Sequence, residues 1–538
     1  MSATTTASAS GVSSSSTSGS YDALVLGAGW SGILTALRLT ENHQKVLLLE
    51  ARERVGGRAF THTYDNNSKG SGDRTVKGKK SWGVEAQRDG VQAVDFGCSW
   101  IHGYYEGNPV KGICEKLNIP VSIPTPKKAT IVGPSGALPE DLVQKITSNL
   151  SNAMSSAQAL ARSWSSGSTP ASASLASYLL AHDSPLFSGL TDEQRPLAEG
   201  YARQMHIPLG TTLEHVALRW AGFEQNFSGT DAAPEGGFTR VIDALVEQFV
   251  QQGGKLASSE EVKKIQSQKE EGIKVVTASG TYEAPVAVCT FPLAVLKQQE
   301  ANLFDPPLSE KKREVIQRTN VGDLNKVMLV YESAWWPKDV GTFTILPSSG
   351  SSSTAQGSAD LPALLAKTTL MVGADTEHSR LLVMIGASAG RDLESFTRPQ
   401  VADALHAYLA ERIPVAGKGE TGVQSPSHNF MTRWSKHALT GGATTTPVVV
   451  GEENSPLDFV ELSKPEYSSH LLFAGEHTDL HHRGSVAGAV VSAEREAARA
   501  LAFLEKRKVN QKHGGGGGGG VKERRKEEVV SDDAAAKM

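Results

Sequence analysis

The amino-acid sequence predicts an α/β fold, because strand and helix signals alternate at both ends of its 538 residues. Near the start, residues 23–26 form an apolar run closed by glycines, and helical spacing over 31–42 precedes a second apolar run over 45–50. Near the end, the apolar stretch 470–476 precedes a long helical pattern over 485–504. We therefore expect one α/β domain that is assembled from separated segments.

The elements between these two ends are mixed in character. Residues 236–253 predict an amphipathic helix, and 274–278 and 284–290 predict two strands separated by a turn at Gly280. The remaining segments lack the apolar patterning of a core, so we expect disorder over 1–20, surface insertions over 64–88 and 347–360, and a flexible tail over 505–538 that contains the glycine run 514–520.

Length and composition narrow the function classes. At roughly 100–200 residues per domain, the chain should hold two large domains and tails. Lys and Arg number 54 against 58 Asp and Glu, and the net charge of −4 argues against nucleic-acid binding through bulk positive charge. Cys98, Cys114 and Cys289 form no CxxC pair, so we expect neither a disulfide scaffold nor a metal site. No run of eighteen apolar residues occurs, and we expect no membrane span.

The glycine-rich turn at residues 27–32 reads GAGWSG, which is the GxGxxG pattern of dinucleotide sites. Gly27 permits the tight turn, Gly29 lets the backbone approach a pyrophosphate, and Gly32 lets the following helix lie close to the strand. Glu50 ends the next strand about twenty residues later, where a carboxylate suits a ribose hydroxyl pair. The pattern predicts a dinucleotide site but does not separate NAD from FAD.

Further stretches resemble, in the same order, segments of the flavin-containing amine oxidase family. Residues 51–58 (ARERVGGR) resemble its second-strand continuation, and 94–110 (VDFGCSWIHGYYEGNPV) resemble the segment under the flavin ring in polyamine oxidases of the fungal or vertebrate-like, peroxisomal type. The other matching stretches are 235–245 with 260–265, 289–297, 324–337, 432–434 and 471–497.

This resemblance implies the two-domain fold of amine oxidases and p-hydroxybenzoate hydroxylase. A Rossmann-like FAD-binding domain is expected from 21–110, 234–320 and 455–504, interleaved with an α+β substrate-binding domain from 111–233 and 321–454. No cysteine follows Cys289, so we expect FAD to be bound non-covalently. The expected FAD contacts are Gly27, Gly29, Trp30, Ser31, Gly32, Glu50, Ala51, Arg52, Gly57, Arg58, Gly97, Trp100, Ile101, Val262, Trp434, Gly475, Glu476, Ser485 and Val486.

Two residues are expected to carry the chemistry. From the residues alone, Lys326 fits a strand-end lysine that reaches solvent, and His102 fits a structural histidine beside aromatic residues. The family resemblance instead implies that Lys326 holds a water molecule at flavin N5, where a lysine of lowered pKa can move a proton. It also implies that His102 faces the substrate amine as a hydrogen-bond acceptor.

The substrate side departs from the family pattern. Many members have an aromatic residue at the position of Ser485 and a histidine at that of Ala487, and the stretch after Trp434 lacks the tyrosines of an aromatic cage. A polycationic substrate needs carboxylates along its channel, and Glu224 is the candidate by position.

These observations predict an FAD-dependent polyamine oxidase. It would oxidise a secondary amine of spermine, spermidine or their N-acetyl derivatives with O₂, giving an aldehyde, a shorter amine and H₂O₂. The open alternatives are an L-amino-acid oxidase or other amine oxidase, and a flavin-containing binding protein with little turnover. A histone demethylase of the same superfamily should carry a coiled-coil insertion that this sequence lacks.

The final tripeptide, Ala536-Lys537-Met538, is a conservative variant of the Ser-Lys-Leu peroxisomal address. We expect an import receptor to bind it, because the glycine run 514–520 leaves this end accessible. A peroxisomal location is therefore predicted, with the cytoplasm as the alternative, while the oligomeric state is left open.

Overall fold

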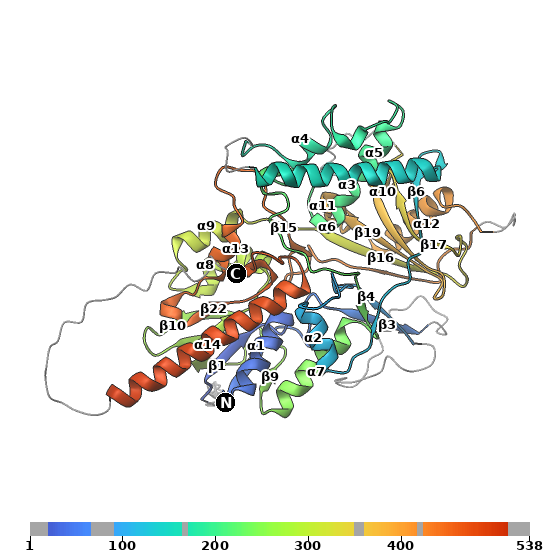
Figure 1. The fold of residues 1–538 in the computed structure, drawn as a ribbon. Coiled ribbons are helices and arrows are strands. Elements are labelled where there is room, and N and C mark those ends of the chain that lie inside the picture. Colours follow the sequence, from blue (N-terminus) through green and yellow to red (C-terminus); the bar gives the residue numbers. More distant parts are fainter. Residues whose placement is uncertain (1–19, 66–90, 164–169, 349–359, 417–422, 515–538) are drawn as a thin grey trace, which may run out of the picture.

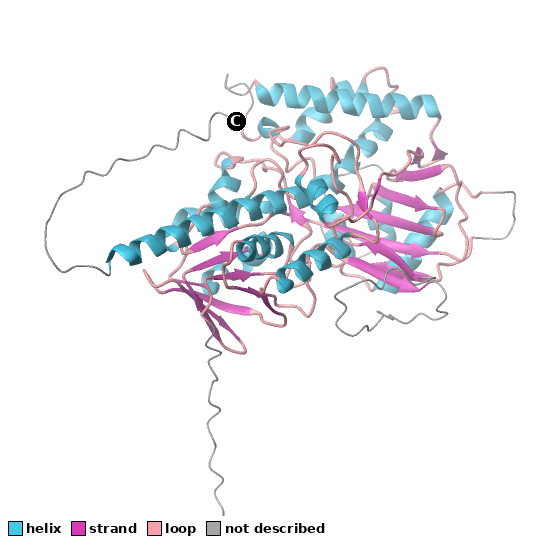
Figure 2. Ribbon diagram, turned by 60° about the horizontal axis from the view of Figure 1, so that its bottom comes forward, coloured by secondary structure: helices cyan, strands magenta, loops and turns pink. Residues whose placement is uncertain are grey.

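The computed structural model describes residues 20–65, 91–163, 170–348, 360–416 and 423–514. It contains two main sheets, each covered by helices, with loops between them (Figures 1 and 2). The segment 1–19, most of the two expected insertions and the tripeptide 536–538 lie outside the described residues.

The first sheet is parallel and has five strands in the order β22-β13-β1-β2-β9. Its strands β1 and β2 belong to the predicted strand–turn–helix–strand unit, with Ala23 opposite Val46 and Leu26 opposite Leu49. Side chains of β1, β2, β13 and β22 are buried on both faces, as in parallel sheets that helices cover on each side. The strands are β1 (Ala23–Leu26), β2 (Val46–Leu49), β9 (Lys255–Ala257), β13 (Val286–Cys289) and β22 (Leu471–Phe473).

Three helices pack together on one side of this sheet. The helix α1 (Trp30–Glu41) contacts both α7 (Phe238–Gln251) and α14 (Val486–Gly514), and the three share one apolar core (Figure 1). The predicted tail boundary is wrong, because α14 continues ten residues beyond Leu504. Glu505 to Lys508 are good helix formers, Arg507 donates to the carbonyls of Glu270 and Glu271, and the helix ends at the first glycine of the run.

The strand prediction over 284–290 joined two different strands. The strand β12 (Thr281–Ala284) forms a hairpin with β11 (Ile273–Thr277), whereas β13 belongs to the five-stranded sheet. Pro285 separates them and has no N–H to donate to a ladder, which explains the break. The hairpin sits in a four-stranded sheet with β10 (Val262–Ser267) and β14 (Phe304–Asp305).

The second main sheet has seven strands in the order β20-β16-β19-β18-β17-β6-β7. Alternate side chains point to opposite faces: Leu381, Val383 and Ile385 pack into a core with two covering helices, α10 (Leu361–Ala366) and α12 (Arg398–Arg412). The strands are β6 (Lys128–Gly133), β7 (Gly136–Ala137), β16 (Leu324–Val330), β17 (Val340–Ile345), β18 (Leu370–Asp375), β19 (Arg380–Gly386) and β20 (His428–Met431).

Shorter elements connect the two main sheets. The hairpin of β3 (Thr61–Asp65) and β4 (Val91–Asp95) packs its Tyr64 and Val94 against Met328 of β16. The long helix α3 (Glu140–Arg162) belongs to a helical layer at the top of Figure 1. The remaining helices are α2 (Pro109–Lys116), α4 (Leu175–Leu179), α5 (Arg195–Ala202), α6 (His206–Leu209), α8 (Leu293–Leu303), α9 (Glu310–Arg318), α11 (Ala387–Leu393) and α13 (Leu457–Ser463). The remaining strands are β5 (Val121–Ser122), β8 (Ala233–Pro234), β15 (Val321–Gly322) and β21 (Thr444–Thr445).

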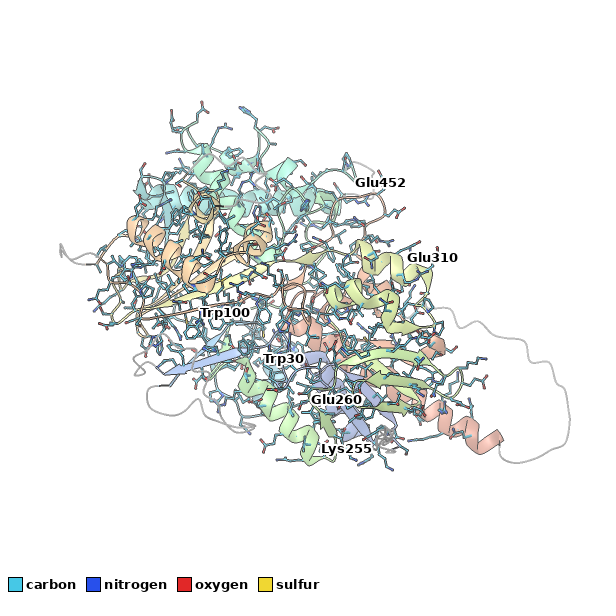
Figure 3. The ribbon with its side chains drawn as sticks, turned by 180° about the vertical axis from the view of Figure 1, so that it is seen from behind. Trp30, Trp100, Lys255, Glu260, Glu310 and Glu452 are labelled. Carbon is cyan, nitrogen blue, oxygen red and sulfur yellow. The ribbon has the colours of Figure 1, made fainter. Side chains whose placement is uncertain are left out.

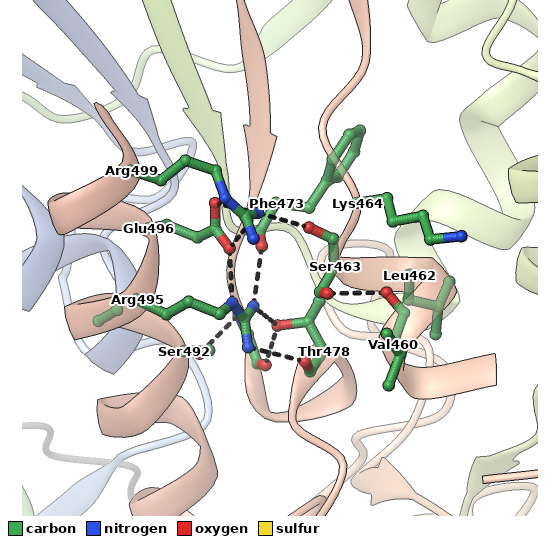
Figure 4. A network of polar contacts seen from close by, with 12 residues as sticks. Val460, Leu462, Ser463, Lys464, Phe473, Thr478, Ser492, Arg495, Glu496 and Arg499 are labelled. Carbon is green, nitrogen blue, oxygen red and sulfur yellow. Dashed lines mark hydrogen bonds and ion pairs between the residues drawn. The ribbon is translucent and has the colours of Figure 1, made fainter. Parts of the chain in front are cut away.

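A partly buried ion-pair network joins α14 to the turn that follows β22 (Figure 4). Arg495 donates to the carbonyl and the hydroxyl of Thr478, and Glu496 accepts from both Arg495 and Arg499. This network positions the residues just after Phe473. Among the described helices, none has the length and apolar character needed to cross a membrane.

Candidate active site

A cavity of about 1100 Å³ lies between the two main sheets, and residues of both line it. This volume slightly exceeds the usual range for a single small-molecule site and is enough for a dinucleotide together with a substrate. Trp30 and Trp100, labelled in Figure 3, belong to its wall.

The glycine-rich turn forms the dinucleotide end. Gly27 has φ +101°, a conformation that glycine adopts without strain. A Cβ on Gly32 would lie 1.8 Å from the carbonyl oxygen of Gly27, so this glycine permits the close packing of α1 that was predicted for it. A Cβ on Gly29 would meet no protein atom within 4 Å. Gly29 is therefore the N-cap that opens the first turn of α1 to a ligand.

Glu50 lies at the end of β2, and its carboxylate is held in place by the backbone. One oxygen accepts from the N–H of Ala28 at 2.8 Å, and the other accepts from Arg52 at 3.0 Å. Each oxygen keeps a lone pair for a further donor. The side chain is buried and lines the cavity, as expected for a group that binds a ribose.

Positive charge is concentrated near the turn. Burial lowers the pKa of Arg54 to about 10, and the neighbouring Arg52 lowers it further. Burial and Arg58 likewise lower the pKa of Arg52, although Glu50 opposes them. Arg58 donates to Glu476 at 2.9 Å. Arginines crowded in this way favour an anion such as a diphosphate.

Among the described residues of the cavity wall, Nε of Arg52 and Nδ1 of His477 are buried and have no hydrogen-bond partner. Burial lowers the pKa of His477 to about 4, so its ring is neutral at physiological pH. Unpaired buried polar atoms are costly unless a ligand or water satisfies them. Together with the open N-cap and the arginines, they show that this end fits a dinucleotide.

Lys326 lies where the dinucleotide end meets the seven-stranded sheet. Its ammonium donates to the carbonyls of Asp95 and Gly97 at 3.1 and 2.7 Å, and to the hydroxyl of Ser99. The residue is 6% exposed, and burial lowers its pKa to about 8 despite the opposing charge of Asp95. It does not reach solvent like an ordinary strand-end lysine; it faces the cavity with a titratable amine.

Asp95, which was not identified from the sequence, supports the loop around Lys326. Its carboxylate accepts from the hydroxyl of Thr61 at 2.5 Å and from the N–H of Phe238 at 3.1 Å, so it caps the start of α7. Burial raises the pKa of Asp95 to about 6. Because its partners lie 34 and 143 positions away, no local pattern could have identified this residue.

The wall opposite the glycine turn is the second face of the seven-stranded sheet, and it too was missed. The side chains that this face presents to the cavity are mainly apolar. They include one ion pair, between Arg380 and Asp375 at 2.8 Å. The segment RLLVMIG (380–386) is apolar on both faces, so the polar–apolar alternation that signals a half-exposed strand is absent. The cavity-facing side chains on strands β16, β18 and β19 include Leu324, Lys326, Met328, Met371, Asp375, Arg380, Leu382 and Met384.

His102 and Trp100 lie in the cavity wall near solvent, with side-chain and residue exposures of 67% and 40%. His102 Nδ1 is 2.8 Å from Asp231 Oδ2, and the other carboxylate oxygen of Asp231 accepts from the N–H of Gly103 at 3.1 Å. Asp231 was not identified from the sequence. It fixes one ring nitrogen of His102 and leaves the other available.

Three predicted contacts do not line the cavity. Gly32 packs against the turn, as described above. Ile101 is buried, and its backbone bonds with Ala232 point the side chain into the core. Glu224, the expected channel carboxylate, forms an ion pair with Arg483 instead of lining the cavity. The cavity does bring together Gly27, Gly29, Trp30, Ser31, Glu50, Ala51, Arg52, Gly57, Arg58, Gly97, Trp100, His102, Val262, Lys326, Trp434, Gly475, Glu476, Ser485 and Val486.

Comparison with known proteins gives a match over most of the chain. The family model described as "Flavin containing amine oxidoreductase" matches residues 30–501. "Lysine-specific histone demethylase 1 homolog 2" of Arabidopsis thaliana is 26% identical over 499 residues, which cover 91% of this chain and 59% of that protein. "Lysine-specific histone demethylase 2" of Homo sapiens is 26% identical over 489 residues, covering 89% and 53%.

"Lysine-specific histone demethylase 1B" of Mus musculus is also 26% identical, over 499 residues that cover 89% of this chain and 53% of that protein. The chain thus spans little more than half the length of the curated relatives named here. Their names describe histone demethylases, whereas the sequence analysis expected the polyamine oxidase branch.

Proposed function

This chain belongs to the flavin-containing amine oxidoreductase family and uses FAD as its cofactor, and from that premise we propose that it oxidises a secondary amine of a polyamine or an N-acetylated polyamine. The observation that carries the proposal is the buried amine of Lys326, placed between an anion-binding end and an apolar wall of one cavity. A dinucleotide at one end and an aliphatic amine at the other would meet beside Lys326.

The reaction removes two hydrogens from a CH–NH unit and forms an imine, which water cleaves to an aldehyde and a shorter amine. FAD, when bound, supplies the acceptor of the hydride equivalent and passes two electrons on to O₂, which becomes H₂O₂. The protein must therefore orient the amine, keep its nitrogen unprotonated and manage charge near the cofactor. No nucleophile or metal ion is needed.

Lys326 suits the proton movements in this sequence. With a pKa near 8, its nitrogen exchanges a proton readily at physiological pH. Three oxygen acceptors from residues 95–99 hold it at a defined place. We assign to it the support of cofactor reoxidation and of imine hydrolysis.

His102 is assigned to the substrate amine. Because Asp231 occupies the region of Nδ1, Nε2 is the nitrogen available to accept a proton from an entering ammonium. The exposed ring of Trp100 offers a face for a cation before it reaches the interior. The polyamine assignment rests on these two residues and on the resemblance of 94–110 to polyamine oxidases.

A second candidate is oxidation of an N-monomethylated lysine, which is also a secondary amine. The observation in its favour is the naming of the relatives as lysine-specific histone demethylases. The chemistry at Lys326 would be the same, while the substrate would be a peptide held at the cavity mouth.

A substrate panel separates the two candidates. The FAD-loaded protein is supplied with spermine, spermidine, their N-acetyl derivatives and a methylated-lysine histone peptide, and H₂O₂ is measured with product identification by mass spectrometry. We expect peroxide with an aminoaldehyde from the polyamine group. Formaldehyde from the peptide alone would overturn the polyamine proposal in favour of demethylation.

A further inference from the structure

Side chains on one face of the seven-stranded sheet lie in rows along the cavity. In the register of the strands, Lys326 stands opposite Met384, and Met328 stands opposite Leu382. On the other side of β19, Met371, Gly373 and Asp375 stand opposite Met384, Leu382 and Arg380. The cavity wall therefore has three consecutive levels: Lys326 with Met384 and Met371, Met328 with Leu382 and Gly373, and Arg380 with Asp375.

The distance between these levels can be calculated, because the rise per residue along a strand is nearly constant. Met384 and Arg380 are four positions apart on β19, and at about 3.2–3.4 Å per residue their levels are about 13 Å apart. The middle level carries only apolar groups and the hydrogen of Gly373. A substrate whose amine lies beside Lys326 thus crosses an apolar stretch before its far end meets Arg380 and Asp375.

At the far level, Arg380 retains free donors while Asp375 is engaged. Asp375 accepts from the N–H and Nδ1 of His378 at 3.1 and 2.9 Å, and from Nε of Arg380 at 2.8 Å. Arg380 also donates through Nη1 to the carbonyl of Ala93 at 3.3 Å. The hydroxyl of Tyr64 also interacts with this guanidinium, and these contacts together do not use all five N–H groups of an arginine. Burial acts to raise the pKa of Asp375, but Arg380 and His378 lower it below its ordinary value, so this carboxylate stays ionised.

The charge of this half of the cavity also favours an oxygen acceptor over a second ammonium. On the wall formed by the seven-stranded sheet and the loop before it, the charged side chains are Lys127, Lys326, Asp375 and Arg380. Three of them are basic and one is acidic. A second ammonium on the substrate would enter a wall of like charge, whereas an oxygen acceptor would find unpaired N–H donors.

We propose that Arg380 is a specificity-determining residue which binds an oxygen acceptor at the far end of the substrate, about 13 Å from the level of Lys326. The acceptor is an acyl carbonyl or a carboxylate, and a terminal ammonium is disfavoured. This inference rests on the proposed amine oxidation and narrows its substrate class to amines that carry an oxygen-bearing end, such as the N-acylated polyamines.

The test uses three secondary amines of equal chain length, which end in an ammonium, an N-acyl group or a carboxylate. Anaerobic reduction of bound FAD and steady-state kcat and KM are measured for each. The wild type should favour an oxygen-bearing end over the ammonium by about tenfold or more in kcat/KM, which is the range of a hydrogen bond to a charged group. The effect should lie in KM, because the contact is remote from the reacting bond.

Variants then assign the preference to one residue. Arg380→Met should abolish it, and Arg380→Glu should reverse it towards the ammonium-ended amine. Arg380→Lys, which keeps the charge but not the two-pronged donor geometry, should keep part of it and serves if Arg380→Met does not fold. Arg195→Met is the matched control, because Arg195 also pairs with an aspartate but does not line this cavity.

The outcomes separate the inference from the proposed function. FAD reduction by all three amines at equal kcat/KM, or a preference that survives in Arg380→Met, overturns the role of Arg380 while leaving amine oxidation intact. A wild-type preference for the ammonium that disappears in Asp375→Asn likewise overturns it. Failure of every amine to reduce FAD overturns the proposed function itself.

Discussion

Lys326 holds its amine at the junction of the two ends of the cavity, where oxygen atoms of residues 95–99 replace the water around a surface lysine. Burial disfavours the ammonium and lowers its pKa to about 8. Lys312 offers a natural comparison: it is equally buried, its pKa is also lowered to about 8 by burial, and it donates to three carbonyls, but it does not line the cavity.

Lys326→Met should keep FAD bound and slow its reoxidation by about 10²-fold, which is the range for loss of one proton-transfer group. Stopped-flow mixing of the reduced protein with oxygenated buffer measures this rate. Lys312→Met is the control; it should lower the melting temperature but leave the reoxidation rate per bound FAD unchanged. Equal rates in both variants and the wild type would remove Lys326 from the reaction.

The same rate should depend on pH through the Lys326 amine. Below a pKa of about 8 the amine is protonated, and its positive charge favours the transfer of electrons to O₂. As pH rises through about 8 this charge is lost, so the wild-type reoxidation rate should fall. The Lys326→Met profile should be flat over the same interval. A wild-type rate that rises with pH contradicts this assignment.

How far single residues can be predicted depends on whether their partners are local. Gly27, Gly29, Gly32 and Glu50 were recognisable because their roles depend on spacing within one short unit. Asp95 and Arg380 acquire their roles from sheet register and from contacts hundreds of positions apart, which no local pattern records. The ion pair of Glu224 with Arg483 is likewise distant in sequence, so its position outside the cavity wall could not be foreseen.

At the scale of elements, the glycine turn and α1 form one unit in which Gly29 and Gly32 have different structural roles. Gly32 provides space for protein atoms, and Gly29 provides space for a ligand. Most neighbouring elements were predicted within a few residues, including β1, β2, α1 and α7. Two predictions were wrong. The strand β12 was merged with the strand after Pro285, and the last turns of α14 were assigned to a tail because of their charged residues.

This division of roles predicts contrasting variants. Gly32→Ala should lower the stability of the FAD-free protein, because its Cβ would lie 1.8 Å from the Gly27 carbonyl. Gly29→Ala should leave the FAD-free melting temperature nearly unchanged but weaken FAD binding at least about tenfold, since its methyl group would occupy ligand space. Calorimetry of the FAD-free forms and FAD titration measure both effects. Equal loss of stability in the two variants would contradict the assignment.

At the scale of the whole molecule, two sheets meet around one cavity whose ends differ in character. The end built on the parallel sheet carries crowded arginines, and the end built on the seven-stranded sheet is largely apolar. The sequence predicted the α/β class, the FAD end and the contribution of distant segments. It did not predict the apolar wall, because Leu and Met face both the core and the cavity there.

FAD should be bound to the protein without a covalent link. Cys98 lies in the cavity wall, and Cys289 lies in the buried strand β13. Burial raises the pKa of both thiols. Acid precipitation should therefore release all the flavin into the supernatant. FAD that stays with the precipitated protein contradicts this prediction.

A peroxisomal location is also proposed, from the tripeptide Ala536-Lys537-Met538. An oxidase that releases H₂O₂ benefits from a compartment that destroys it. A fluorescent protein fused to the N-terminus should colocalise with peroxisomes, and deletion of 536–538 should make it diffuse without loss of activity. A full-length fusion that is already diffuse would show that this signal does not function.

The most direct test of amine oxidation is a single turnover without oxygen. FAD-loaded protein is mixed anaerobically with a secondary amine, and the visible absorbance of oxidised FAD is followed while products are identified. We predict a loss of that absorbance at a rate which saturates with amine concentration, and one aldehyde and one shorter amine for each FAD reduced. If FAD stays oxidised with polyamines, their N-acyl derivatives and methylated-lysine peptides alike, the cavity does not oxidise amines.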